Sequence, residues 1–271
     1  MKIIALIFSC IVLGYSGFSQ ERIEPTVDVK AHTIGLASDI DYVTKTQLLY
    51  PVTLLKKNIN QDVKVDFTVL SNGTITDIEF IQLNLKTPKD KYKEEFKTEV
   101  KRLLRYFIFE PAKIGNISVA SKSSLTFKFN TGLYRKYTKA RGFAIPKELP
   151  LFDTSFVIYE RADVSPEYIK GEDAFKEYII SNLEYPDLAI RQGLQGTVVL
   201  SFIVEPNGYL SNLVIEKEFN HLCTNEAIRI MRDTKWKAAK KNGKYVRYKS
   251  KYPIVFNLNN INKDNSNGEQ R

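Results

Sequence analysis

Two stretches of the chain alternate between apolar and polar residues, and each leads into a turn. The first runs from Val63 to Val69 and the second from Val198 to Val204, with an apolar side chain at every second position. A period of two is typical of a β-strand with one buried face. The turns contain Asn72-Gly73 and Asn207-Gly208, where Gly can adopt the positive φ of a hairpin turn. The pattern therefore predicts two β-hairpins.

The two hairpins belong to an internal repeat. Residues 50–81 align without a gap to residues 185–216, at an offset of 135 (185 − 50). The first copy then carries extra residues around Gln82 to Lys89, and the match resumes at an offset of 127 (236 − 109), where Phe109 corresponds to Trp236. Self-similarity of this kind indicates a duplicated structural unit.

Each copy continues with a helix and a closing strand. Apolar residues recur at helical spacing from Phe96 to Phe107 and from Leu222 to Met231. Alternating residues follow at Val119–Phe129 and Val246–Phe256. With a short helical segment before the hairpin, each copy is predicted to be helix, hairpin, helix and strand. The predicted fold class is α+β, with two tandem small antiparallel sheets that each have helices packed on one face.

The repeat also sets the expected domain boundaries. The expected parts are a lead-in at 21–40, the first copy at 41–130, a connector at 131–165, the second copy at 166–258 and a polar tail at 259–271. The connector contains an apolar run from Phe152 to Tyr159. We expect this run to add a strand to one of the copies rather than to act as a free linker.

The N-terminus is typical of an exported protein. Lys2 precedes an uncharged apolar stretch from Ile3 to Phe18, and small residues follow near Ser19. Sixteen helical residues reach roughly 24 Å, less than the roughly 30 Å of a bilayer core. Residues 1–20 are therefore predicted to be a cleaved signal peptide, and an inner-membrane anchor if they stay uncleaved. Cleavage removes Cys10 and leaves Cys223, which is expected to pack in a helix core.

Composition excludes several classes of protein. With 43% hydrophobic residues among 271, the chain has enough apolar material for a packed core and is neither disordered nor fibrous. The net charge of +9 favours acidic partners, but export argues against nucleic acid. His32 and His221 lie in different segments, and no phosphate loop, nucleophile elbow or zinc motif occurs. We therefore expect no enzyme, no metal and no cofactor.

The second copy resembles a known family over residues 166–258. The residues that carry the resemblance are Pro166-Glu167-Tyr168, Gly171-Glu172-Asp173-Ala174, Asn182-Leu183-Glu184-Tyr185-Pro186, Gly193, Gly196-Thr197-Val198, Pro206-Asn207-Gly208, Asn225-Glu226-Ala227-Ile228-Arg229, Trp236-Lys237, Asn242-Gly243-Lys244 and Pro253-Ile254-Val255-Phe256. In this order they resemble the C-terminal domain of TonB-family energy transducers, in the form common among Bacteroidota. The first copy resembles it in degenerate form, with Asn58 and Gln61 in place of Gly193 and Gly196.

The resemblance implies a periplasmic domain whose terminal strand pairs with the TonB box, a short extended segment of an outer-membrane transporter. In that family an inner-membrane complex supplies energy through an uncleaved helix and a Pro-rich spacer. This chain departs on both counts, because its N-terminal segment is predicted to be cleaved and Pro25 is the only proline between residue 20 and the first copy. The resemblance therefore supports peptide capture more than energy transduction. The peptide-binding residues that it implies are Asn182, Tyr185, Pro186, Val246, Arg247, Tyr248, Lys249, Lys251 and Tyr252.

Physical reasoning also favours strand addition at the closing strand of the second copy. An exposed sheet edge offers unpaired N–H and C=O groups, and Pro253 is a residue that edge strands tolerate. Residues 235–251, the basic stretch, contain eight Lys and Arg without an acidic residue. These charges attract an acidic peptide, but they also fit protection of the edge from aggregation. They equally fit a scaffold module that binds cell wall or lipopolysaccharide and has no role in energy transduction.

The outward faces of the two hairpins differ. The first is polar, with Asp62, Lys64, Asp66 and Thr68, whereas the second is half apolar and needs a cover. The first copy, the connector strand and a second protomer of a homodimer are the three candidates. Trp236 is expected to anchor the core, because Phe109 replaces it in the other copy.

Overall fold

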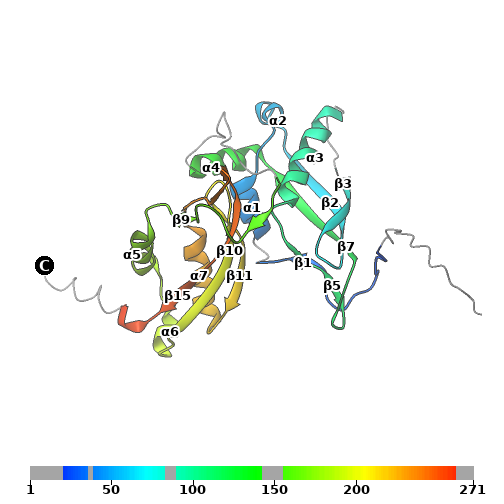
Figure 1. The fold of residues 1–271 in the computed structure, drawn as a ribbon. Coiled ribbons are helices and arrows are strands. Elements are labelled where there is room, and N and C mark those ends of the chain that lie inside the picture. The colour runs from blue at the N-terminus through cyan, green and yellow to red at the C-terminus, as the bar shows by residue number, and fades with distance from the viewer. Residues whose placement is uncertain (1–20, 36–38, 83–89, 142–154, 261–271) are drawn as a thin grey trace, which may run out of the picture.

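The computed structural model describes residues 21–35, 39–82, 90–141 and 155–260. The predicted signal peptide and nearly all of the extra residues at 82–89 lie outside these ranges. We call residues 21–141 the first unit and residues 155–260 the second unit. Both mix short helices with small antiparallel sheets, so the expected α+β class is confirmed (Figure 1).

The first unit is built around a three-stranded sheet with the order β3-β2-β7. Its elements are β1 His32–Thr33, α1 Asp39–Gln47, α2 Val52–Lys56, β2 Gln61–Val69, β3 Ile75–Gln82, α3 Asp90–Leu104, β4 Phe109–Glu110, β5 Ala112–Ile114, β6 Ile117–Val119, β7 Ser121–Phe129 and α4 Thr131–Arg141.

The second unit is built around a four-stranded sheet with the order β11-β10-β15-β8. Its elements are β8 Ile158–Tyr159, β9 Glu167–Tyr168, α5 Glu172–Asn182, α6 Asp187–Arg191, β10 Gly196–Val204, β11 Leu210–Lys217, α7 His221–Arg232, β12 Trp236–Lys237, β13 Lys240–Lys241, β14 Lys244–Tyr245, β15 Arg247–Phe256 and a 3-10 turn at Leu258–Asn260.

The two central sheets share their register. Val63 of β2 faces Phe127 of β7, and the corresponding pair in the second unit is Val198 and Ile254. Both hairpins turn at the expected glycines, Gly73 with φ 82° and Gly208 with φ 78°. A side chain at Gly208 would come within 2.1 Å of the carbonyl oxygen of Trp236, so this turn requires glycine.

The N-terminal segment of each unit adds to its closing strand in the same way. Ile23 forms a parallel bridge with Ala120, and Ile158 pairs in parallel with Arg247. The two pairs correspond in the repeat, because Ile158 follows Ile23 by 135 residues and Arg247 follows Ala120 by 127 residues. The apolar end of the connector does contribute a strand, β8, and that strand belongs to the second unit. The lead-in plays the matching role in the first unit.

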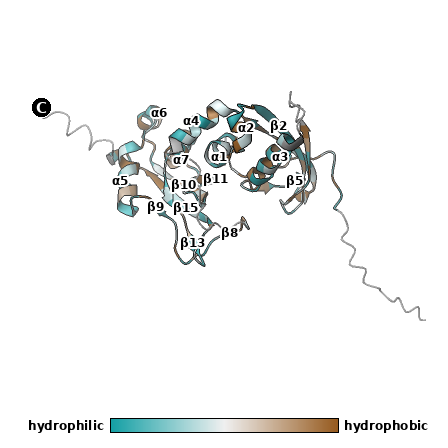
Figure 2. Ribbon diagram, turned by 90° about the horizontal axis from the view of Figure 1, so that it is seen from above, coloured by the Kyte–Doolittle hydropathy of each residue, from teal (hydrophilic) through white to brown (hydrophobic). Residues whose placement is uncertain are grey.

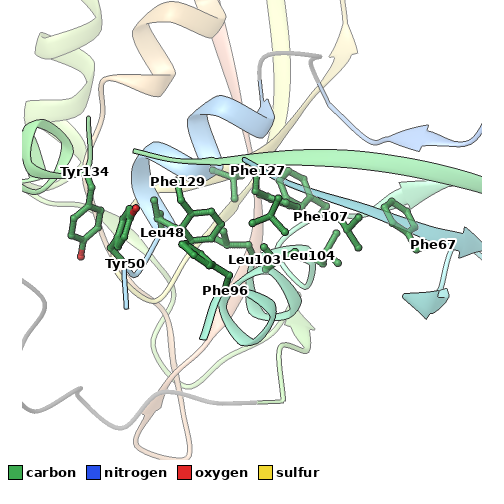
Figure 3. Close-up of a cluster of buried hydrophobic side chains, with 14 of the residues drawn as sticks. Leu48, Tyr50, Phe67, Phe96, Leu103, Leu104, Phe107, Phe127, Phe129 and Tyr134 are labelled. Carbon is green, nitrogen blue, oxygen red and sulfur yellow. The ribbon is translucent and has the colours of Figure 1, made fainter. Parts of the chain in front are cut away.

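Each unit encloses its own aromatic core. In the first unit the rings of Tyr50 and Phe96 lie 5.6 and 4.8 Å from Phe129 (Figure 3). In the second unit Trp236 contacts Phe175 and Phe202, with ring centroids 5.1 and 5.6 Å away. The indole N–H of Trp236 donates to the Thr234 hydroxyl at 2.8 Å. Trp236 is thus part of the core packing, as expected from the sequence.

The first unit covers part of the outward face of the second sheet, on the side of β11 and β10. Helix α1 lies beside β11 between the two sheets (Figures 1 and 2). Ser201 and Ile203, on that face of β10, are buried. The hydroxyl of Tyr42 in α1 donates to the carbonyl of Arg232 at 3.1 Å, and the Arg232 guanidinium lies over the Tyr42 ring. The first unit, one of the three candidates named from the sequence, therefore covers the outward face of the second hairpin.

Candidate functional site

The closing strand β15 leaves most of one edge unpaired. Strand β10 pairs with it along one side from Phe256 to Tyr248. On the other side β8 pairs only with Arg247 and Tyr248. Among the described residues, no strand pairs with the outer side of Lys249–Phe256. We call this segment the open edge.

The position of Pro253 defines which backbone groups face outward. Pro253 lies opposite Val199 of β10, and a proline fits there if its nitrogen, which has no hydrogen, points away from β10. Alternate residues of a strand share both a face of the sheet and an edge. Lys249, Lys251 and Val255 therefore also direct their backbone groups outward.

The side chains of this outward set are exposed. Val255 is 53% exposed, and Lys249, Lys251 and Pro253 are exposed as well. Lys249 forms an ion pair with Glu160, at 3.6 Å between Nζ and Oε1. Lys251 has no ion pair within the described ranges. The N–H of Lys249 is used in the parallel pairing of Tyr248 with Tyr159 of β8. The open edge therefore presents two N–H donors, four carbonyl acceptors and two ammonium groups to solvent.

The first residues of the expected peptide site lie in the interior. Val246 is buried, and its N–H donates to the carbonyl of Ala239 at 3.1 Å. The side chain of Arg247 is 4% exposed and pairs with Glu205, which is fully buried, at 2.7 Å. The same guanidinium donates to the carbonyls of Arg105 and Tyr106 in the first unit, at 3.0 and 3.1 Å. Arg247 thus joins the two units.

The two tyrosines of the expected site are engaged in packing. Tyr248 lies next to β8, and its hydroxyl donates to the carbonyl of Glu160 at 2.9 Å. The ring of Tyr252 lies 4.7 Å from that of Phe175 in α5. Burial raises the pKa of the Tyr252 phenol. Both side chains help to fix β15 in place.

Asn182, Tyr185 and Pro186 lie at the other end of β15. The ring of Tyr185 is 5.4 Å from Phe256, and its hydroxyl donates to the carbonyl of Leu194. The side-chain amide of Asn182 donates to the carbonyl of Tyr178, and Pro186 precedes α6. At about 3.3 Å per residue, the ten residues of β15 separate this group from Arg247 by roughly 30 Å.

The basic stretch is partly neutralised by acidic residues from other segments, which corrects the expectation of eight uncompensated charges. Arg247 pairs with Glu205, Lys249 with Glu160, and Lys237 with Glu167 at 2.9 Å. The partners were missed because they lie outside residues 235–251. At least three of the eight cations therefore have a carboxylate partner, and the positive field beside the open edge is weaker than the sequence suggests.

The sequence did contain a signal for β8. At the offset of 135, Asp28-Val29 corresponds to Asp163-Val164. The carboxylate of Asp28 accepts the N–H of Gly115 at 2.6 Å, and that of Asp163 accepts the N–H of Asn242 at 2.7 Å. Extending the repeat toward the N-terminus would have found both segments.

The described residues contain no group of three or more His, Cys, Asp and Glu side chains placed to hold a metal ion. Cys223 is fully buried, and burial raises the pKa of its thiol. The described helices are also too short or too polar to cross a membrane.

Comparisons with known proteins concern mainly the second unit. Residues 181–258 match the family model of the Gram-negative bacterial TonB protein C-terminal region. The solution NMR structure of the Pseudomonas aeruginosa TonB C-terminal domain is 25% identical, with coverage of 41% of this chain and 95% of that one and a TM-score of 0.26. No curated protein matches the chain.

Proposed function

We propose that residues 181–258, which match the family model of the TonB protein C-terminal region, form a domain that captures an extended peptide by strand addition at the open edge of β15. The peptide is the TonB box of an outer-membrane transporter, so the protein supports TonB-dependent transport from the periplasm. The observation that carries the proposal is the unpaired edge from Lys249 to Phe256.

The geometry of the edge suits an extended ligand. The outward N–H groups of Lys251 and Val255 are donors for such a strand, and each backbone hydrogen bond contributes about 0.5 to 1.5 kcal/mol. Pro253 interrupts the donors but leaves its carbonyl as an acceptor. The Tyr248 end of the edge is closed by β8, so the peptide occupies the edge from Lys249 onward.

The exposed lysines favour a peptide with acidic flanks. Lys251 is unpaired within the described ranges, and Lys249 has only the exposed Glu160 as its partner. An acidic residue of the peptide can replace Glu160 at little cost, because exposed ion pairs contribute little stability. The lysines thereby accelerate association more than they slow dissociation.

In this proposal the first unit is a degenerate copy of the same domain. Support comes from the shared register of the sheets and from the matching contacts of the N-terminal segments. Its role toward the second unit is mechanical, because it covers part of the outward face of that sheet and leaves the edge free.

The test is a titration of TonB-box peptides against the chain from residue 21 onward, with Lys251→Pro and Lys251→Gln as matched variants. Lys251→Pro removes an outward N–H and should weaken binding at least about fivefold, mainly through faster dissociation. Lys251→Gln keeps the N–H and should mainly slow association and reduce its salt dependence.

Tyr248→Pro is the structural control. Tyr248 lies opposite Val204 and an odd number of residues from Pro253, so its N–H points toward β10. A proline at this position removes a hydrogen bond to β10 and should lower stability. Equal peptide affinity for Lys251→Pro and the wild type would refute capture at this edge. Saturable binding of cell-wall fragments without any peptide binding would favour the scaffold function instead.

A further inference from the structure

A groove in the first unit lies between the lead-in and the outward face of the sheet. It has a cavity volume of about 620 Å³, within the range of small-molecule sites. The lead-in contributes an apolar wall of Ile23, Pro25, Val27 and Ala31, together with Glu24 and Lys30. The opposite wall is polar and consists of Lys64, Asp66, Ser121, Lys122, Ser123 and Ser124 from β2 and β7.

One buried polar atom in this groove lacks a partner. The Oδ1 atom of Asp66 forms no hydrogen bond with any described residue, and Asp66 lies opposite Ser124 on the outward face of the sheet. The hydroxyl of Ser121 also lacks a partner, but Ser121 lies opposite Val69 and faces the core. A buried polar atom without a hydrogen bond costs about 1 to 3 kcal/mol, so Asp66 favours an occupant that supplies a polar group. A hydroxyl group can satisfy it, because a hydroxyl donates to a carboxylate.

The groove carries an excess of positive charge. Lys30, Lys64 and Lys122 have no ion pair among the described residues, while the acidic residues of the lining are Asp66 and Glu24. Glu24 is already paired with Arg22 at 3.2 Å. Glu79 lies opposite Asp66 on β3 but does not line the groove. The three ammonium groups therefore face one uncompensated carboxylate, which leaves room for about two negative charges on a ligand.

We propose that this groove binds an anionic sugar, a hexose that carries a phosphate or a carboxylate group. The lysines hold the anionic group, Asp66 binds a ring hydroxyl, and the C–H face of the sugar packs on Ile23, Pro25 and Val27. An inorganic anion uses only the lysines, and a neutral sugar leaves them unpaired. The combination of charge, hydroxyl partners and an apolar wall selects a ligand that has all three features.

The corresponding surface of the second unit lacks this site. At the offset of 135, Val199 and Ser201 replace Lys64 and Asp66. Ser201 is buried there, because the first unit covers the face. The groove is therefore a property of the first unit alone, and it gives that unit a binding role separate from peptide capture.

The experiment is a titration of the chain from residue 21 onward with four probes, followed by NMR. The probes are glucose 6-phosphate, galacturonic acid, glucose and inorganic phosphate. Saturable binding is expected for one or both anionic sugars, and their comparison identifies the preferred anionic group. Glucose should bind at least about tenfold more weakly, because it lacks the charge-assisted hydrogen bonds to the lysines. Phosphate should also bind at least about tenfold more weakly, because it lacks the ring hydroxyl that binds Asp66 and the C–H face that packs on the apolar wall.

Matched variants test the residues. Lys64→Gln combined with Lys122→Gln should weaken binding of the anionic sugar at least about tenfold, and Asp66→Asn should weaken it less. Lys128→Gln is the control, because Lys128 is exposed on the same face of β7 but outside the groove. Peptide titrations on the same samples should be unchanged, which separates this site from the open edge.

Three outcomes would overturn the proposal. The first is no binding of either anionic sugar up to about 10 mM. The second is equal affinity for glucose or for inorganic phosphate. The third is a loss with Lys128→Gln as large as that with the groove variants.

Discussion

Replacement of Arg247 by methionine tests the interior position of this residue. The guanidinium makes hydrogen bonds of 2.7 to 3.2 Å with Glu205 and two further bonds with carbonyls of the first unit. Methionine fills part of the volume but leaves Glu205, which is fully buried, with only the Ser211 hydroxyl as a described partner. Loss of one partner from a buried ion pair costs about 3 to 5 kcal/mol, so we expect a loss of unfolding free energy in this range.

The assay is urea unfolding followed by the fluorescence of Trp236, the single tryptophan, which is partly buried and packs against the core of the second unit. The double variant Arg247→Met with Glu205→Leu removes both charges and should recover most of the loss. A loss below about 1 kcal/mol for Arg247→Met would be typical of an exposed ion pair and would refute the buried geometry.

Two further predictions concern the core of the second unit. Trp236→Ala should cost about 3 to 5 kcal/mol through the lost transfer free energy and the remaining cavity, measured by circular dichroism; unchanged stability with lost peptide binding would instead make Trp236 a ligand platform. Cys223 should react slowly with iodoacetamide in the native state and rapidly in urea, because burial raises the pKa of its thiol and blocks access. Rapid labelling of the native protein, followed by mass spectrometry, would contradict the buried position.

The sequence predicted well those features that depend on local pattern. Alternation fixed the faces of β2 and β10, because a shift by one residue would move every apolar side chain to the wrong face. Asn58, which stands where the second copy has Gly193, adopts φ 52° against 64° for the glycine. Asparagine tolerates this left-handed region better than most residues, so the degenerate copy keeps the same turn.

Features that depend on contacts between distant segments could not be predicted. Arg247 belongs by its position to a basic stretch, but its partner Glu205 lies on β10 and its other acceptors lie at Arg105 and Tyr106. Alternation within β15 did not show which residues face solvent, because the first unit covers one end of the outward face. Charge counts along the sequence therefore overestimated the positive field at the edge.

The duplication lets one sheet face serve two purposes. In the second unit the outward face is lined by residues such as Val199 and Ser201, and it receives α1 and the turn after α3. In the first unit Lys64 and Asp66 keep the same face polar, so it stays open to a ligand under the lead-in. Because both units keep the same register, these differences arise from outward side chains alone and leave the inner cores intact. The inner face of β15 packs on the core of the second unit through Ile254 and Phe256, which holds the edge in place and reduces the entropic cost of adding a strand.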